Sequence, residues 1–282
     1  MTHLDISALE AWVGRQESRE DVISPGPAAG LSATLDYGSP RARVGEPLPP
    51  LWHWLYFLPA LPASELGEDG HARRGGFLPP VTLPRRMWAG SRIRFESPLR
   101  VGDQARRDST IASVSHKQGS AGDLVFITVR HRIYCNDKLA IEEEQDIVYR
   151  EAATGNSVPK PKPAPEEAQW TRQIAPDPVL LFRYSALTFN SHRIHYDRDY
   201  ATKVEGYPDL VVQGPLTATL LLDSLYREWP DAQVEGFRFR GVRPLLEGRP
   251  LLLQGRRNDR SATLWALDGG GALAMKADAR LL

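Results

Sequence analysis

The stretch from Arg183 to Ala201, RYSALTFNSHRIHYDRDYA, concentrates side chains that could carry out chemistry. Two of the chain's seven histidines, His192 and His195, lie three residues apart in it, and Asn190 precedes them. A neutral imidazole can take a proton from water near pH 7, because histidine has a suitable intrinsic pKa. Asparagine can hold a water molecule but cannot act as a base. The cluster is therefore our first candidate for a catalytic site.

A metal site and a solvated polar turn are the other interpretations of this cluster. His192 and His195 would share one face of a helix, and Asp197 or Asp199 could add an oxygen ligand. No third strong ligand stands at a usual spacing, so we expect no bound metal. The largely apolar segment 182–189 disfavours a simple surface turn, because it places the polar cluster at the end of a core segment, where buried polar groups need partners.

The elements that must hold this cluster include several antiparallel strands. Alternating polar and apolar residues indicate strands with one wet face, at 92–96, 123–135, 237–242, 262–268 and 272–282. The pattern Pro-Leu-x-x-Gly follows the first run in each half, at 97–103 and 243–249. The two halves therefore resemble each other, which suggests a duplicated domain.

One helix-like apolar segment lies before the strands of each half, at 50–59 and 214–229. In the second segment Leu216 and Leu220 share one face, and Pro215 suits a first helical turn. A helix followed by a meander of long strands predicts a sheet wrapped around a helix. We therefore expect an α+β fold with two antiparallel sheets, each wrapped around a central helix.

The domain boundaries are predicted from a change in composition near the middle of the chain. Residues 151–170 are rich in proline, alanine and charge, which is typical of an extended linker. This gives an N-terminal domain at 1–150 and a C-terminal catalytic domain at 171–282. The Gly- and Pro-rich insert 66–86 of the first half reads as a lid or a loop that contacts the ligand.

Composition excludes several classes of function for this chain of 282 residues. Lysine plus arginine equals aspartate plus glutamate at 35 each, which argues against nucleic acid or a membrane surface as the partner. Cys135 is the only cysteine, so an intrachain disulfide and a cysteine-based zinc site are excluded. No apolar run approaches ~20 residues, and the acidic N-terminal segment lacks the features of a signal peptide. We expect a cytoplasmic protein.

The segments 185–201 and 211–221 resemble the active-site region of MaoC-like enoyl-CoA hydratases, the hotdog-fold hydratase 2 group. That motif runs Gly-Asp-x-Asn-Pro-x-His, then x-Asp-x-x-Tyr-Ala, and later a His-Gly-x-Leu helix start. His195 aligns with the catalytic histidine. The other matching positions are Asp197, Tyr200, Ala201, Gln213, Gly214, Pro215 and Leu216.

The chain departs from this motif at two positions. Asn190 stands where the family has its catalytic aspartate, and His192 where it has asparagine. This variant is similar to the type 2 hydroxyacyl-thioester dehydratases and to the double-hotdog hydratases of itaconyl-CoA and mesaconyl-CoA, which act in itaconate degradation. Residues 83–103 resemble the dehydratase-like first half of those proteins. The resemblance implies a double hotdog fold in which the first half is degenerate.

The resemblance also implies roles for the residues of the cluster. His195 would be the base and proton shuttle, and Asn190 would orient the water. The backbone N–H of Gly214, at the start of a helix, would bind the thioester oxygen as negative charge develops there. His192 would contact the water or hold the loop.

A branched dicarboxylic acyl-CoA as substrate would require cations in the binding site. We expect Arg183 or Arg193 to bind the second carboxylate, although a surface ion pair is the alternative for both. The further predicted substrate contacts are Tyr184 and Gln213, and the predicted contacts to the coenzyme A phosphates are Arg73, Arg74, Arg85 and Arg86. Coenzyme A would enter as part of the substrate, so we expect no separate cofactor. A homodimer is compatible with the fold.

Three functions remain open from the sequence. The first is a hydratase that converts itaconyl-CoA or mesaconyl-CoA to citramalyl-CoA. The second is a 3-hydroxyacyl-thioester dehydratase of fatty-acid synthesis, which runs the same chemistry in reverse on an acyl carrier protein. The third is a non-catalytic acyl-thioester binding protein, which the missing aspartate would suit.

Overall fold

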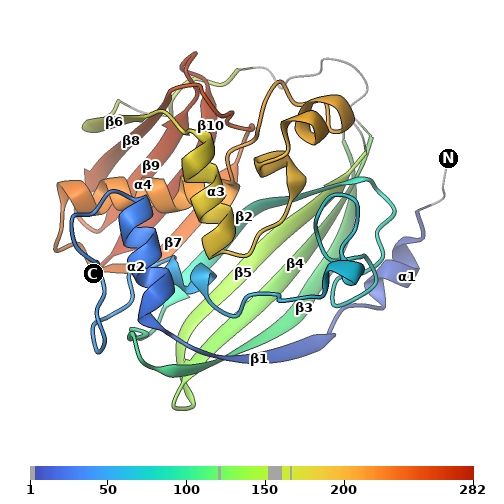
Figure 1. Cartoon of the computed structure of the whole chain (residues 1–282), viewed down its shortest axis with the longest axis horizontal. Coiled ribbons are helices and arrows are strands. Elements are labelled where there is room, and N and C mark those ends of the chain that lie inside the picture. The colour runs from blue at the N-terminus through green and yellow to red at the C-terminus, as the bar shows by residue number, and fades with distance from the viewer. Residues whose placement is uncertain (1–3, 120–121, 152–160, 166) are drawn as a thin grey trace.

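The structure is a computed structural model that describes residues 4–119, 122–151, 161–165 and 167–282 (Figure 1). The elements of the first half are α1 (Ile6–Glu10), β1 (Gln16–Val22), α2 (Pro25–Thr34), η1 (Trp52–Leu55), η2 (Ala63–Glu65), β2 (Arg85–Phe95), β3 (Gln104–Gly119), β4 (Gly122–Cys135) and β5 (Lys138–Arg150). Those of the second half are β6 (Trp170–Ile174), α3 (Pro178–Leu187), η3 (Arg193–His195), η4 (Tyr200–Val204), α4 (Gly214–Glu228), β7 (Val234–Gly241), β8 (Leu251–Asn258), β9 (Ser261–Leu267) and β10 (Leu273–Leu281).

All the strands form one ten-stranded antiparallel sheet, in the order β1-β3-β4-β5-β2-β7-β10-β9-β8-β6. Read outward from the middle, each half repeats one pattern. β2, β5, β4, β3 and β1 on one side correspond to β7, β10, β9, β8 and β6 on the other. The duplication suggested by the sequence is therefore visible in the topology, and each of the five predicted strands lies within a strand of the structure or overlaps one. The two expected sheets are joined edge to edge.

The two halves meet where β2 pairs with β7, and glycine is needed at this seam. Gly90 lies opposite Arg240 in the antiparallel register, beside an irregularity in the β2–β5 pairing. A Cβ at Gly90 would lie 2.3 Å from the carbonyl oxygen of Phe239, a backbone atom that cannot rotate away. Only a residue without a side chain allows the two strands to approach this closely.

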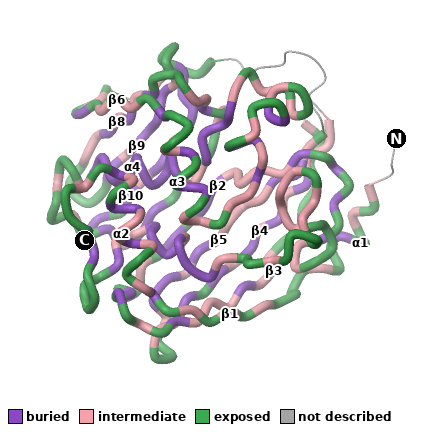
Figure 2. Tube along the Cα trace, viewed as in Figure 1, coloured by how far each residue is buried: buried purple, intermediate pink, exposed green. Residues whose placement is uncertain are grey.

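Helix α4 is the central helix of the second half, as the sequence predicted. Its residues from Leu216 to Leu225 are all buried, and it packs against β8, β9 and β10. In Figure 2 it lies in a continuous buried region beneath the second half of the sheet. Burial around nearly its whole circumference explains why its sequence is apolar on more than one face.

The helix expected at 50–59 is much shorter than predicted. The structure contains only one turn of 3-10 helix there, η1, in the position in the chain order that α4 has in the second half. Prolines at 49, 50 and 59 flank this segment and limit helix growth. The concave face of the first half is therefore not filled by a long helix, and this leaves space for a cavity.

The structure describes the whole insert but only part of the predicted linker. The insert carries a small bridge between Leu66 and Ala72, and Arg74 fastens it by donating to the carbonyls of Val81, Leu83 and Pro84. Half of the predicted linker, residues 152–160 and 166, lies outside the described residues, so the domain boundaries remain a prediction.

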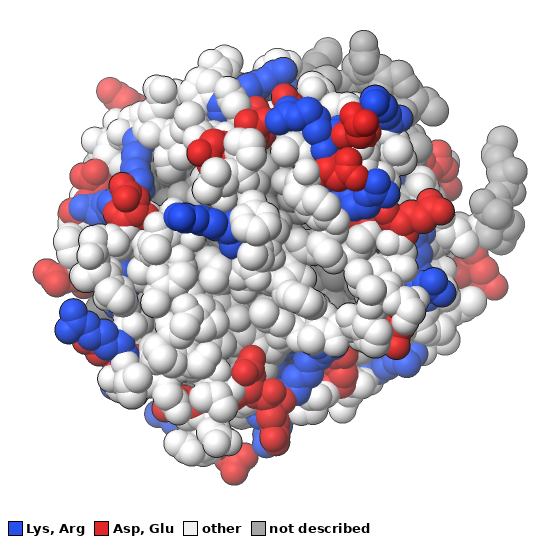
Figure 3. Space-filling model, viewed as in Figure 1, with Lys and Arg blue, Asp and Glu red and all other residues white. Residues whose placement is uncertain are grey.

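The surface carries both signs of charge in a mixed pattern. Figure 3 shows lysine, arginine, aspartate and glutamate interspersed around a largely uncharged centre of this face. No helix in the described parts of the chain has the length and apolar character that crossing a membrane requires.

The seam gives a stability prediction. We expect Gly90→Ala to destabilise the fold by about 1–3 kcal/mol, because the added methyl group forces β2 away from β7. Gly26→Ala is the matched control, since a Cβ at Gly26 meets nothing within 4 Å. Urea unfolding of both variants measures the difference, and equal midpoints would show that the seam tolerates a side chain.

Candidate active site

A cavity of about 2220 Å³ opens between the two halves of the chain. Its walls come from the concave face of the first half, the insert, the segment from α3 to η3, and the N-terminus of α4. His192, His195, Asn190 and Gly214 all line it. The structure therefore brings the catalytic residues predicted from the sequence into one cavity.

His195 has a defined proton arrangement. Its Nδ1 lies 2.7 Å from the carbonyl oxygen of Val211, which can only accept a hydrogen bond. In the neutral ring Nδ1 therefore carries the proton, and Nε2 keeps a free lone pair. Burial lowers the pKa of His195 to about 4, although the bond to Val211 works in the opposite direction. The ring is thus a neutral proton acceptor at physiological pH.

Gly214 begins α4 and offers an N–H at the positive end of the helix dipole. At the start of this helix the Thr217 N–H donates to the Gln213 carbonyl at 3.0 Å. The Gly214 N–H comes three residues before that donor in the chain. A Cβ at Gly214 would meet only the Trp88 carbonyl oxygen, at 3.8 Å. The protein itself therefore does not require glycine here, and Gly214 lines the cavity without a close neighbour on its Cβ side.

Asn190 lines the cavity and also holds the turn that carries His192. Its Oδ1 accepts a hydrogen bond from the backbone N–H of His192 at 3.1 Å, so this oxygen is used to hold the turn. His192 is 7% exposed, and burial together with the charges of His71 and His195 lowers its pKa to about 2. Neither residue supplies a carboxylate in place of the aspartate that the motif lacks.

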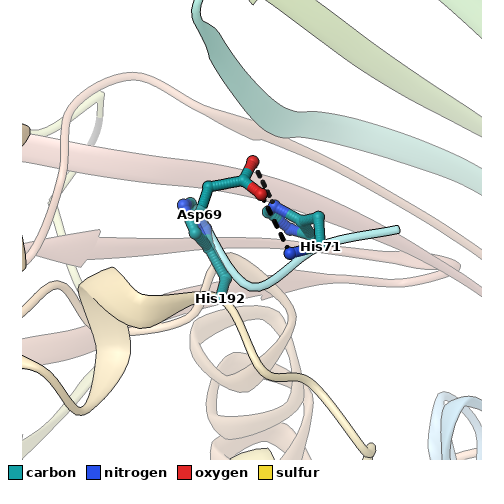
Figure 4. Close-up of side chains that lie close together, drawn as sticks. All are labelled: Asp69, His71 and His192. Atoms are coloured by element: carbon teal, nitrogen blue, oxygen red, sulfur yellow. Dashed lines mark hydrogen bonds and ion pairs between the residues drawn. The ribbon is translucent and has the colours of Figure 1, made fainter. Parts of the chain in front are cut away.

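A carboxylate does enter the site, from the insert of the first half. His71 donates to Asp69 twice, from its backbone N–H to Oδ1 and from ring Nδ1 to Oδ2, both at 3.0 Å. Figure 4 shows the pair on the insert, with His192 rising toward it from the second half. Because Nδ1 of His71 donates to the carboxylate, its Nε2 is left with a free lone pair.

The electrostatics of this pair favour a neutral imidazole beside an ionised carboxylate. Burial alone would raise the pKa of Asp69, but the hydrogen bonds and charge of His71, with the charge of Arg86, hold it well below its usual range. Burial lowers the pKa of His71, with a contribution from the charge of Arg86, and the bond to Asp69 opposes this.

Three imidazoles lie in a row along the cavity wall. The ring centroids of His71 and His192 are 4.1 Å apart, and those of His192 and His195 are 5.4 Å apart. Ligand atoms of Asp69, His71 and His192 also lie within 4.8 Å of one another, a grouping that could hold a metal ion. Both carboxylate oxygens of Asp69 are already engaged by His71, and the charge of Arg86 is felt at all three groups. Both facts favour proton chemistry over cation binding.

The insert is fastened to the second half by backbone contacts. Arg193 donates its backbone N–H to the Asp69 carbonyl at 3.0 Å, and the Ser191 hydroxyl donates to the Gly70 carbonyl. Gly70 has φ +85°, and a Cβ there would lie 1.9 Å from the Ser191 carbonyl oxygen. This close approach fixes Asp69 and His71 against the histidines of the second half.

The sequence analysis missed Asp69 and His71. It identified the insert as a loop that contacts the ligand but considered only its arginines. The available signal was an aspartate two residues before a histidine in that loop, EDGHARR. Nothing in the spacing alone indicates that this pair reaches residues more than a hundred positions later.

Three of the four predicted substrate contacts lie outside the cavity. Arg183 is exposed on α3, and Arg193 forms an ion pair with Asp197, with Nη2 2.6 Å from Oδ2. Gln213 is fully buried, and its amide nitrogen donates to the Leu181 carbonyl and to the Ser185 hydroxyl, each at 2.9 Å. Local partners hold Arg193 and Gln213, and Arg183 is exposed to solvent. Tyr184 does line the cavity.

The four arginines predicted to bind phosphates all line the cavity, but their surroundings differ. Arg74 is bound to backbone carbonyls, and Arg85 pairs with Glu205 at 3.0 Å. Arg73 is exposed and donates to the Leu66 carbonyl at 3.3 Å. Arg86 is half-buried beside the imidazoles. Arg74 and Arg85 thus have structural partners, which makes them poor phosphate ligands.

Comparison with known proteins places the chain among acyl-thioester enzymes. The family model described as hydroxyacyl-thioester dehydratase type 2 matches residues 51–247. A mesaconyl-C(4)-CoA hydratase from Chloroflexus aurantiacus is 50% identical over 274 residues, covering 96% of this chain and 97% of the relative. A mitochondrial hydroxyacyl-thioester dehydratase type 2 from Schizosaccharomyces pombe is 30% identical, covering 82% and 87%.

Solved structures agree on the fold. HtdX from Mycobacterium tuberculosis has a TM-score of 0.69 at 19% identity and covers 95% of this chain and 100% of its own. Another M. tuberculosis protein, described as having a double hotdog fold, has a TM-score of 0.58 at 16% identity and covers 96% of both chains. The expected double hotdog is thus confirmed.

The protonation of His195 gives a second prediction. We expect its ring to remain neutral, with the proton on Nδ1, down to about pH 5, because its pKa lies below that of ordinary histidine. The folded state then binds fewer protons than the unfolded chain, so the contribution of His195 to stability falls as pH drops from about 6.5 toward the folded pKa. Imidazole ¹⁵N shifts, assigned with His195→Gln, measure this, and titration near pH 6.5 would contradict it.

Proposed function

This chain belongs to the hydroxyacyl-thioester dehydratase type 2 family, and from that premise we propose that it hydrates a branched unsaturated dicarboxylic acyl-CoA. The candidate substrates are mesaconyl-CoA and itaconyl-CoA, and the product would be citramalyl-CoA. Its relationship to a named CoA hydratase makes the chain a hydro-lyase. The observation that carries the proposal is that His195, whose Nδ1 is bound to Val211 so that Nε2 keeps its lone pair, and Gly214 at the start of α4 line the same cavity.

The proposed reaction needs one proton acceptor and one oxyanion site. His195 Nε2 takes a proton from water as the water oxygen bonds to the β-carbon of the substrate. In mesaconyl-CoA, whose double bond is conjugated with the thioester, the electron pair of the double bond moves toward the α-carbon and negative charge develops on the thioester oxygen, which accepts a hydrogen bond from the Gly214 N–H. The proton on His195 then passes to the α-carbon, the thioester carbonyl re-forms, and the ring becomes neutral again.

His195 and Gly214 are linked through the backbone. Val211, whose carbonyl fixes the tautomer of His195, lies three residues before Gly214, and its own N–H donates to the Ile194 carbonyl at 2.9 Å. A short segment therefore holds the base and the oxyanion donor at a fixed separation. Such pre-organisation keeps the catalytic groups from having to rearrange during the reaction.

Asp69 and His71 are the best candidates for the second polar group of the site. Asn190 cannot fill this role easily, because its oxygen already accepts from His192. The lone pair on His71 Nε2 is held in place by Asp69, in the way that a carboxylate orients an imidazole in a catalytic triad. We infer that this pair orients the water or the neighbouring His192 ring.

A dehydratase that acts on an acyl carrier protein is the second candidate function. The S. pombe relative carries that family's dehydratase name, and the same groups would work in the reverse direction. Parallel assays with mesaconyl-CoA, crotonyl-CoA and a crotonyl carrier protein separate the two. A protein that turns over none of the three would support the non-catalytic binder.

His195→Ala should lower the hydration rate of mesaconyl-CoA by about 10²-fold or more, because it removes the general base. Loss of the enoyl-thioester absorbance measures the rate. His116→Gln is the control. His116, on β3, pairs with Asp123 on β4 and does not line the cavity. Wild-type turnover in His195→Ala would exclude His195 as the base.

Asp69→Asn should lower kcat by about 10- to 100-fold with little change in KM. An asparagine has one side-chain oxygen for the two N–H donors of His71, its backbone N–H and its ring Nδ1. Either one of these hydrogen bonds is lost, or the ring proton of His71 moves to Nε2. Glu68→Gln removes the same charge from the exposed neighbouring residue and should have no effect. Equal effects of both variants would reduce the role of Asp69 to general electrostatics.

A further inference from the structure

Arg86 is a half-buried arginine of the cavity wall with no side-chain partner among the described residues. It lies on β2, and within the described ranges no hydrogen bond, ion pair or ring contact of its side chain is found. A cation taken partly out of water normally gains a counter-charge or hydrogen bonds in return. Arg86 therefore carries an unsatisfied charge that a ligand could meet.

Other arginines of the cavity wall do have acidic partners. Arg85 pairs with Glu205, and Arg243 pairs with Asp268 at 3.2 Å. Arg150 is also half-buried, and its Nε has no hydrogen-bond partner in the described ranges, but its charge, with that of Arg85, opposes the effect of burial on the Glu205 carboxyl. Arg86 differs because the acidic group that its charge acts on, Asp69, is already bound twice by His71.

The position of Arg86 matters as much as its missing partner. Its charge acts on His71, on His192 and on Asp69, so it lies beside the imidazole cluster. Arg240 and Arg249 also line the cavity but are exposed. Exposed arginines suit the highly charged phosphates of coenzyme A, whereas Arg86 is half-buried and its charge acts on His71 and His192.

The chemistry of a short dicarboxylic acyl group requires a cation at such a position. In the 4-thioester of mesaconate, the free carboxylate is bonded directly to the β-carbon, the atom that water attacks. A receptor for this carboxylate must therefore lie within a few ångströms of the catalytic base, on the order of one side-chain contact. Arg183 and Arg193, the cations expected from the sequence, lie outside the cavity, whereas Arg86 lines the same cavity as His195.

We propose that Arg86 binds the free carboxylate of the acyl group and thereby selects a dicarboxylic over a monocarboxylic acyl-CoA. This inference rests on the proposed function of the site. A guanidinium can bind both carboxylate oxygens in a planar fork. This geometry binds the carboxylate and also fixes the position of the β-carbon attached to it. An acyl chain that ends in a methyl group leaves Arg86 desolvated and unpaired, so the site discriminates against it.

Unreactive analogues separate this inference from the hydration itself. The 4-thioester of 2-methylsuccinate with coenzyme A and isovaleryl-CoA have no double bond, and they differ only in a carboxylate against a methyl group. Calorimetric titration of the wild type and of Arg86→Met with both analogues measures the contribution of the carboxylate. The coenzyme A part is constant, so it cancels in the comparison.

Arg86→Met should weaken binding of the methylsuccinyl thioester by about 10- to 100-fold and leave isovaleryl-CoA within about 2-fold. Arg86→Lys should fall between, because it keeps the charge and loses the fork. Arg249→Met is the matched control, and any loss it causes should be equal for both analogues. Unchanged isovaleryl-CoA binding also shows that the variants are folded.

Two results would overturn the inference. Equal weakening of both analogues in Arg86→Met would assign Arg86 to coenzyme A, and no weakening of either would remove it from the site. The proposed function fails separately, if the wild type binds the dicarboxylic analogue selectively through Arg86 but does not hydrate mesaconyl-CoA. If mesaconyl-CoA is hydrated and Arg86→Met binds both analogues normally, only the inference fails.

Discussion

The hydrogen bond from His195 Nδ1 to the Val211 carbonyl is the interaction on which the site depends. A buried neutral imidazole can place its proton on either nitrogen, and only one arrangement leaves a lone pair facing the cavity. The Val211 carbonyl settles this because it can only accept. The same residue lies just before α4, so one short segment fixes both the proton acceptor and the helix N-terminus that faces it.

The duplicated fold explains how such a site obtains its space and its second wall. Each half contributes the same order of strands, but only the second keeps a long helix against its sheet. The single turn of η1 leaves the concave face of the first half open, and the cavity occupies part of that region. The insert then covers it and contributes Asp69 and His71. The first half thus supplies the chamber and an acid–base pair, while the second supplies His195 and Gly214.

Charge in this chamber is arranged to keep the imidazoles neutral. Burial lowers the pKa of each of the three histidines, and their mutual repulsion and Arg86 add to the effect on some of them. Two direct contacts oppose this lowering: Asp69 at His71 and the Val211 carbonyl at His195. Neutral rings can accept protons from water, and the uncompensated guanidinium favours an anionic ligand next to them. A dicarboxylic thioester satisfies both conditions together.

The sequence by itself determined the local features: the strands, the central helix at 214–229, the duplication and the cluster around His195. These follow from periodicity, turn residues and a compact motif, all of which are encoded within short segments. The tertiary structure alone decided which groups complete the site. Asp69, His71 and Arg86 are distant from His195 in the chain and reach it only because the insert docks on Ser191 and Arg193 and because β2 pairs with β7. It likewise decided that Gln213 and Arg193 serve packing and ion pairing, because the partners that occupy them are chosen by folding and not by spacing.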